Sequence, residues 1–214
     1  MEPSRIGILG SGDVGRALGR GFARHGWDVT LGTRSPDELR AELGPSEEGI
    51  AVGTFAEAAA HGDVVILAVL GDAAEAVVDM AGTDTFAGKL VLDATNPLDF
   101  SEGVAHLSFG GTDSLGERIQ EKLPGASVVK CFNTVSNIQM VDPEFEEGTP
   151  PMFICGDDDD AKAQTEAILV ELGWPGVMDV GDITSARYLE ALVPLWVRVG
   201  SNLGTWKHAF KAVQ

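Results

Sequence analysis

The sequence lacks a long hydrophobic run, a metal-binding spacing and a surplus of basic residues. No stretch approaches the ~20 consecutive apolar residues of a membrane-spanning helix, so we expect no membrane partner. The chain has 15 Lys and Arg residues against 33 Asp and Glu residues, a formal charge of −18. This balance argues against nucleic acid or an anionic membrane as a partner. The N-terminal residues lead directly into an apolar segment, without the layout of a signal peptide, which favours a cytoplasmic location.

Cysteine and histidine are also scarce. Cys131 and Cys155 show neither a C-x-x-C motif nor a zinc-ligand spacing, so we expect buried free thiols in a reducing cytoplasm. The four histidines form no triad or ligand pattern, and no metal site is expected. The four acids at 157–160 are interpreted as the N-terminus of a helix, where the helix dipole favours carboxylates, rather than as a metal site.

A glycine motif between a strand and a helix organises the chain. Residues 6–9 form an apolar run that ends in the spacing G-x-G-x-x-G. Apolar residues then recur at helical spacing, and residues 27–31 are again extended, so strand, helix and strand follow within about thirty residues. In this context the glycines permit a tight turn, a close approach to a pyrophosphate and helix–strand packing. We therefore predict a dinucleotide site that includes Gly10, Ser11, Gly12, Asp13, Val14 and Gly15.

The residues after the second strand indicate which dinucleotide binds. NAD sites usually carry Asp or Glu at this point, which accepts hydrogen bonds from the ribose. This chain instead has Thr33, Arg34 and Ser35. Arg34 can pair with a 2′-phosphate and stack near the adenine, and the two hydroxyls add donors. The pattern favours an NADP(H) site over the alternative that Arg34 is only a solvated cation in a loop.

The rest of the chain alternates strands and helices. Apolar segments at 64–69, 89–93 and 127–132 predict buried parallel strands, separated by helices at 72–80 and 114–123. Residues 99–112 are expected to be an irregular loop, and Thr54 with Glu57 predicts a capping box. The fold class is therefore α/β, a doubly wound, mainly parallel Rossmann sheet. Strands at 152–155 and 176–180 and helices at 157–172 and 183–203 extend this sheet at its C-terminal side.

We divide the chain into an NADP-binding Rossmann core, residues 1–131, and a C-terminal extension, residues 132–214. The extension is expected to complete the sheet and the acceptor pocket within one compact unit. The backbone of Ala68, Val69 and Leu70 is expected to lie against the cofactor's adenosine side. Asn96, in a turn that ends at a proline, is either part of the nicotinamide side or an ordinary turn residue.

The chain resembles the NADPH:deazaflavin (coenzyme F-420) oxidoreductases in four segments: residues 10–15 with 32–34, 154–158, 179–187 and 189–194. This resemblance covers nearly the whole chain. The pattern is also similar to the cytoplasmic NADPH-oxidising domain of six-transmembrane metalloreductases, and residues 129–135 are closer to that second branch. Archaeal deazaflavin enzymes tend to carry histidine where Asn133 stands here.

The resemblance implies that Thr33 and Arg34 hold the 2′-phosphate, and that Leu70, Asn96 and Asn133–Thr134 border the nicotinamide and its partner ring. Hydride transfer between two such rings needs no nucleophile and no metal, because the cofactors carry the chemistry. No catalytic residue is therefore assigned. Asn133 and Thr134 either position the rings or form a capped strand end.

The sequence thus favours an NADP-dependent oxidoreductase that transfers hydride between NADP(H) and deazaflavin coenzyme F-420. An NADPH-dependent FMN, FAD or ferric reductase is the first alternative. A carbonyl or imine dehydrogenase is another and would need a general acid, for which Lys130 is a candidate. A sensor that binds NADP(H) without turnover also remains open. The apolar helix 183–203 is expected to cover the acceptor pocket or a second subunit, so we predict a homodimer.

Overall fold

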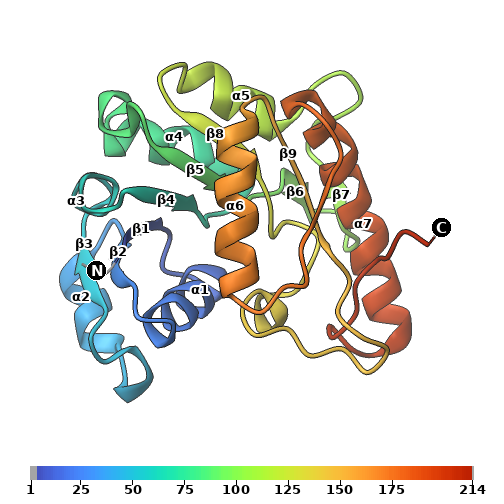
Figure 1. The fold of residues 1–214 in the computed structure, drawn as a ribbon, viewed down its shortest axis with the longest axis horizontal. Coiled ribbons are helices and arrows are strands. Elements are labelled where there is room, and N and C mark those ends of the chain that lie inside the picture. The colour runs from blue at the N-terminus through green and yellow to red at the C-terminus, as the bar shows by residue number, and fades with distance from the viewer. Residues whose placement is uncertain (1–3, 214) are drawn as a thin grey trace.

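Within residues 4–213, which the computed structural model describes, eight strands pair into one sheet in the order β10-β9-β8-β5-β4-β1-β2-β3 (Figure 1). Six neighbouring strands of this sheet, β3, β2, β1, β4, β5 and β8, are parallel and follow the Rossmann order 3-2-1-4-5-6. β9 is antiparallel to β8, and β10 is parallel to β9. The predicted fold class is confirmed. The strands are β1 (Arg5–Leu9), β2 (Asp28–Gly32), β3 (Ala51–Gly53), β4 (Val64–Leu67), β5 (Leu90–Asp93), β8 (Ser127–Lys130), β9 (Met152–Gly156) and β10 (Val177–Asp179).

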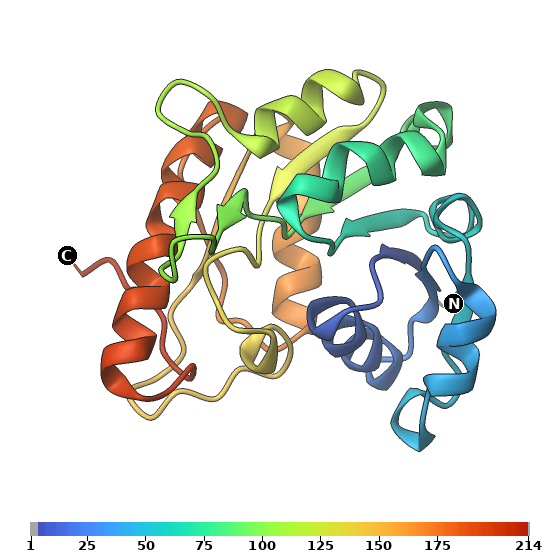
Figure 2. The same cartoon turned by 180° about the vertical axis from the view of Figure 1, so that it is seen from behind.

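Helices cover both faces of the sheet (Figures 1 and 2). One face carries α1 (Asp13–Arg24) and α6 (Asp159–Glu171), and the other carries α3 (Phe55–His61), α4 (Gly71–Ala81) and α5 (Leu115–Lys122). α2 (Pro36–Glu42) contacts β3 at the edge of the sheet. α7 (Ala186–Leu203) packs on α5, and Pro194 lies within it as part of one continuous helix. Short 3₁₀ turns complete the chain: η1 (Pro45–Glu47), η2 (Thr83–Phe86), η3 (Asn137–Gln139) and η4 (Ile183–Ser185).

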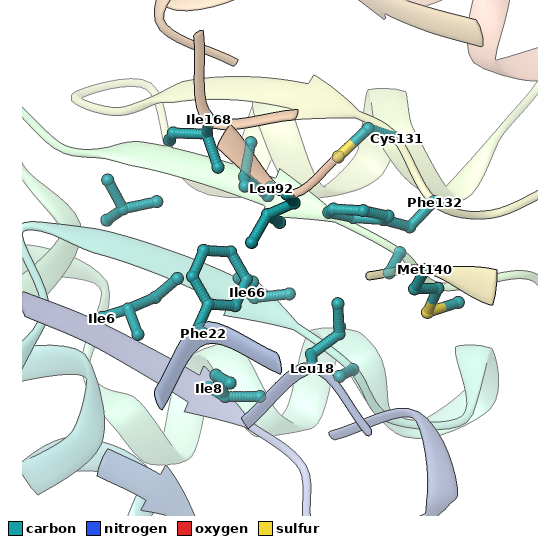
Figure 3. Close-up of a cluster of buried hydrophobic side chains, with 14 of the residues drawn as sticks. Ile6, Ile8, Leu18, Phe22, Ile66, Leu92, Cys131, Phe132, Met140 and Ile168 are labelled. Carbon is teal, nitrogen blue, oxygen red and sulfur yellow. The ribbon is translucent and has the colours of Figure 1, made fainter. Parts of the chain in front are cut away.

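The parallel strands send alternate side chains into two separate cores. Ile6 and Ile8 of β1 pack with Ile66 and Leu92 on the side of α1 and α6 (Figure 3). The intervening positions, such as Leu9, belong to the cluster under α3, α4 and α5. Because both faces are covered, these strands are uninterrupted apolar runs rather than alternating ones.

Local signals place the helix starts as predicted. The Thr54 hydroxyl accepts from the Glu57 backbone N–H at 3.2 Å, and the Glu57 carboxylate accepts from the Thr54 N–H at 2.7 Å. This capping box begins α3. Asp158 caps α6 by accepting from the backbone N–H of Ala161, and Asp159 and Asp160 follow in the first turn. Three of the four acids therefore form the N-terminus of α6, whereas Asp157 Oδ1 accepts from the Ile183 backbone N–H.

Several predicted boundaries are wrong, including the start of the last helix, because Ile183–Ser185 form η4 and α7 begins at Ala186. Residues 99–112 are not wholly irregular, because β6 (Leu98–Asp99) and β7 (His106–Leu107) pair as an antiparallel ribbon that contacts α7 (Figure 2). β4 ends at Leu67 because the chain turns into α4, and β8 ends at Lys130 because Phe132 has a left-handed backbone, with φ 63°.

The predicted division at residue 131 falls between β8 and β9, two neighbours in the same sheet. It stays a prediction, and residues 1–3 and 214 lie outside the described part of the chain. Across residues 4–213, no helix is both long enough and apolar enough to span a bilayer.

Candidate functional site

A cleft of about 580 Å³ opens where β1, β2, β4 and β5 end. Parallel strands of a doubly wound sheet bind ligands at this edge. Most of the predicted cofactor residues line the cleft: Gly10, Ser11, Gly12, Asp13, Val14, Thr33, Arg34, Ala68, Val69 and Leu70. Gly15 and Ser35 do not line it, and neither do Asn96, Asn133 and Thr134. Ala94 does, two residues before Asn96.

Each glycine of the motif has a different local environment. Gly10 has φ 134°, and a Cβ there would lie 2.2 Å from the Ala68 carbonyl oxygen. A Cβ at Gly15 would lie 2.0 Å from the Gly10 carbonyl oxygen, so α1 can rest on β1 only if this position has no side chain. A Cβ at Gly12 would meet nothing within 4 Å. Gly12 is the N-cap of α1, and no side chain caps the helix there. The cleft thus has open space beside uncapped N–H groups, which suits an anion.

The end of β2 presents a cation and no carboxylate. Arg34 is exposed, and across residues 4–213 its guanidinium has no hydrogen bond or ion pair. The Thr33 hydroxyl accepts from the Ser35 backbone N–H at 3.4 Å, and Ser35 is the N-cap residue of α2. Asp13, in the first turn of α1, is the single acid among the described lining residues.

An apolar wall of the cleft was missed by sequence reasoning. α4 carries one apolar stripe of Ala74, Val77, Val78 and Ala81 that is buried in the core. A second stripe at the same i, i+3, i+4, i+7 spacing lines the cleft together with Phe55: Ala73, Ala76, Val77 and Met80. Leu70 and Met80 are 79% and 50% exposed although they are apolar. The double stripe is the signal in the sequence, because a helix that packs only on a sheet needs one apolar face.

Asn96 and Asn133 form a reciprocal pair beyond the cleft. Asn96 Nδ2 donates to the Asn133 backbone carbonyl at 3.0 Å, and Asn133 Nδ2 donates to Asn96 Oδ1 at 3.0 Å. The backbone carbonyl only accepts, so it fixes the orientation of the Asn96 amide, which in turn fixes that of Asn133. Asn133 Oδ1 therefore points away from the pair. It is buried and has no hydrogen-bond partner among the described residues.

The chain reaches Asn133 through a strained residue. Phe132 has φ 63°, a region that costs a bulky L-residue roughly 1–2 kcal/mol. Its side chain is fully buried and points into the cluster around Leu92 and Met140 (Figure 3). The buried ring holds the backbone in this conformation and so fixes Asn133, with Thr134 buried directly after it.

A group of buried charges lies behind the amide pair. Lys130 Nζ is 2.9 Å from Asp93 Oδ2 and 2.7 Å from Glu190 Oε1, and all three side chains are essentially inaccessible. Burial works against the charge of Lys130, but the two carboxylates outweigh it and raise the pKa of the ammonium above its ordinary value. Lys130 does not line the cleft. A buried, paired ammonium with a raised pKa is a poor general acid.

The remaining sequence candidates lie apart from the cleft. Cys131 and Cys155 are free and buried, as predicted, and burial raises the pKa of the Cys155 thiol to about 12. The four histidines each contact a different partner. His208 stacks on Trp196, with ring centroids 4.6 Å apart, and Trp196 Nε1 donates to the His208 backbone carbonyl.

Comparisons with known proteins identify the family and agree with the fold. Residues 5–97 match the family model described as NADP oxidoreductase, coenzyme F420-dependent. The chain is 39% identical to a proposed F420-dependent NADP reductase from Arthrobacter sp. FB24. That crystal structure has a TM-score of 0.93, and the match covers 98% of this chain and 99% of the other. The chain belongs to this family. It is an NADP-dependent oxidoreductase with a Rossmann fold.

Other relatives share only part of their length with this chain. It is 32% identical to the metalloreductase STEAP3 of Rattus norvegicus over 91% of this chain and 38% of that protein. The match to the metalloreductase STEAP2 of Homo sapiens is 24% identical and covers 41% of that protein. The chain thus spans about two fifths of these metalloreductases. An imine reductase from Aspergillus terreus, at 21% identity and TM-score 0.67, shows the same fold.

We predict that Phe132→Gly is more stable than Phe132→Ala, by roughly 0.5–1 kcal/mol in free energy of unfolding. Glycine adopts φ 63° without a Cβ clash. At most other positions a glycine variant is less stable than the alanine variant, so this order is diagnostic. Both variants should be less stable than wild type by about 3–5 kcal/mol, because both lose the buried ring. Urea unfolding measures the three values. An alanine variant as stable as the glycine variant would show that the backbone here is not strained.

Proposed function

We propose that this chain transfers hydride between NADP(H) and a deazaflavin of the coenzyme F-420 type. The observation that carries the cofactor assignment is the buried Asn133 Oδ1, which has no hydrogen-bond partner in the described part of the chain and lies beyond the end of a cleft that begins at Arg34. An acceptor oxygen left unpaired in a buried place costs about 1–3 kcal/mol, and a carboxamide N–H of a nicotinamide removes this cost.

The cleft suits the phosphates and adenosine of NADP(H), and the amide pair beyond its end suits the carboxamide. Arg34, which has no partner among residues 4–213, and the Thr33 hydroxyl suit the 2′-phosphate. The open space at Gly12 and the uncapped start of α1 suit the pyrophosphate, and the apolar stripe of α4 suits the adenosine. Asn96 orients Asn133, whose Oδ1 would accept a hydrogen bond from the carboxamide. When bound, the nicotinamide supplies the hydride, and the protein supplies orientation and exclusion of water.

Two observations support a flat, redox-active ring as the acceptor. The described lining residues include no histidine, lysine or tyrosine that would protonate a carbonyl or imine product. Lys130, the candidate acid, is enclosed by Asp93 and Glu190. The full-length similarity to the proposed F420-dependent reductase of Arthrobacter favours a deazaflavin among such rings.

A flavin or ferric reductase is the second candidate function. The 32% identity with rat STEAP3 supports it, as does the resemblance of residues 129–135 to the metalloreductase branch. The two candidates differ in electron chemistry. A deazaflavin accepts hydride as a two-electron unit, whereas a flavin also passes single electrons to oxygen or ferric iron.

Arg34→Ala should weaken NADPH binding about 10- to 100-fold, because a charge-assisted contact contributes about 1.5–3 kcal/mol. NADH, which has no 2′-phosphate, should bind almost as before. Calorimetric titration of both cofactors measures the effect. Arg40→Ala is the matched control, since Arg40 is engaged with Asp37 and the Val52 carbonyl and should leave both affinities unchanged. An equal loss for the two cofactors would assign Arg34 a structural role.

The acceptor is tested with 4-deuterated NADPH and three acceptors in separate assays: F-420, FMN and a cyclic imine. We expect bleaching of the deazaflavin absorbance, stereospecific transfer of deuterium, and no oxygen consumption.

Asn133→Leu should slow the transfer at least tenfold by removing the carboxamide acceptor. Gly12→Val should fold, since the space there is open, and should show no turnover because its side chain occupies the place of the pyrophosphate.

Each alternative has its own signature in the same assays. Rapid turnover of FMN with oxygen consumption, and none of F-420, would assign the chain to the metalloreductase-like function. Turnover of the imine alone would assign it to the dehydrogenases. Tight NADPH binding without turnover of any acceptor would indicate a sensor.

We also propose that the protein is a cytoplasmic homodimer. Tyr188, Leu195 and Leu203 on α7 are 75%, 53% and 61% exposed, which is unusual for three large apolar residues on one helix. A second copy of α7 is the proposed cover. Light scattering should give twice the mass of one chain for wild type, and the mass of one chain for Leu195→Glu. A monomeric wild type would contradict the proposal.

A further inference from the structure

The buried group of Asp93, Lys130 and Glu190 satisfies every oxygen that it contains. Asp93 Oδ1 accepts from the Thr95 N–H at 2.9 Å and from the Thr95 hydroxyl at 2.6 Å, while Oδ2 faces Lys130. Glu190 Oε1 accepts from Lys130 and from the Gly116 N–H at 3.0 Å. Its Oε2 accepts from the Leu115 N–H at 3.0 Å. The excess negative charge therefore rests on the N-terminus of α5, where the helix dipole favours it.

This buried group links the two segments that carry Asn96 and Asn133 to α7 and to the start of α5. Asp93 and Lys130 are register partners at the ends of β5 and β8. The Asp93–Thr95 bonds shape the turn that leads to Asn96, and Lys130 lies three residues before Asn133. Glu190 adds α7 and the start of α5, which themselves touch closely, since a Cβ at Gly116 would lie 2.7 Å from the Ala186 Cβ.

We infer that Glu190, through Lys130 and Asp93, positions the amide pair of Asn96 and Asn133 for the nicotinamide. Glu190 touches neither cofactor nor acceptor, so it is a positioning residue. The inference rests on the proposed function, because it requires the nicotinamide to bind at Asn133. A purely structural role for Glu190 would lower stability without acting on one half of the cofactor.

Binding of NADP⁺ and of 2′,5′-ADP separates the two halves of the site. The fragment carries the 2′-phosphate and adenosine but no nicotinamide, so the dissociation constant of 2′,5′-ADP divided by that of NADP⁺ reports the nicotinamide half alone. Glu190→Gln should reduce this ratio about tenfold, the value of one hydrogen bond lost, and leave the 2′,5′-ADP constant within about twofold. Thr95→Val, which removes only the hydroxyl bond to Asp93, should act in the same direction. It is the second variant should Glu190→Gln not fold.

Arg187→Gln is the matched control. Arg187 lies on the same helix, one turn before Glu190, and its ion pair with Glu117 also joins α7 to α5 without reaching the strand ends. It should leave the ratio unchanged. Equal effects of Arg187→Gln and Glu190→Gln would overturn the inference, as would a ratio unchanged in both Glu190→Gln and Thr95→Val.

Asn133→Ala keeps this test distinct from that of the proposed function. If Asn133→Ala lowers the ratio and Glu190→Gln does not, only the positioning role fails. If Asn133→Ala leaves the ratio unchanged, the nicotinamide does not bind there, and the inference fails together with the cofactor placement.

Discussion

The contact of α1 with β1 is the constraint on which the cleft depends. A backbone carbonyl, that of Gly10, occupies the place that a side chain at Gly15 would need. The backbone at the end of β4 lies equally close to β1, since the Ala68 carbonyl oxygen would lie 2.2 Å from a Cβ at Gly10. Three backbone segments thus meet with no side chain between them. This close approach brings the start of α1 to the ends of β1 and β4, so the first N–H groups of the helix face the same space as Arg34.

The parts of the fold that local patterns determine could be predicted from the sequence. Parallel strands buried on both faces are continuous apolar runs, and capping residues mark the starts of α3, α5 and α6. The glycine spacing and Arg34 predicted residues that line the cleft, because a helix N-terminus and a strand end lie close in sequence in such a motif. The boundaries were wrong where tertiary contacts decide them. The strand ends before Phe132 because its ring packs in the core and holds the backbone in a left-handed conformation (Figure 3).

The proposed nicotinamide end of the site depends on contacts between distant residues. Asn96 and Asn133 are 37 positions apart, and Glu190 lies 74 positions from the Gly116 N–H to which it bonds. No periodicity or spacing reports such pairs. The double apolar stripe of α4 was visible in the sequence, but only the structure shows which stripe faces the core. Residue types alone also suggested Lys130 as an acid, whereas its surroundings make it a fixed charge.

The two ends of the sheet have a consequence for how this protein behaves at high concentration. Its outermost strands, β3 and β10, contain three residues each. A strand of this length offers few free N–H and carbonyl groups to another chain, and short edges are one way in which sheet proteins avoid joining edge to edge. The formal charge of −18 adds mutual repulsion between molecules. An eight-stranded sheet that is apolar on both faces is in this way kept from growing into a longer one.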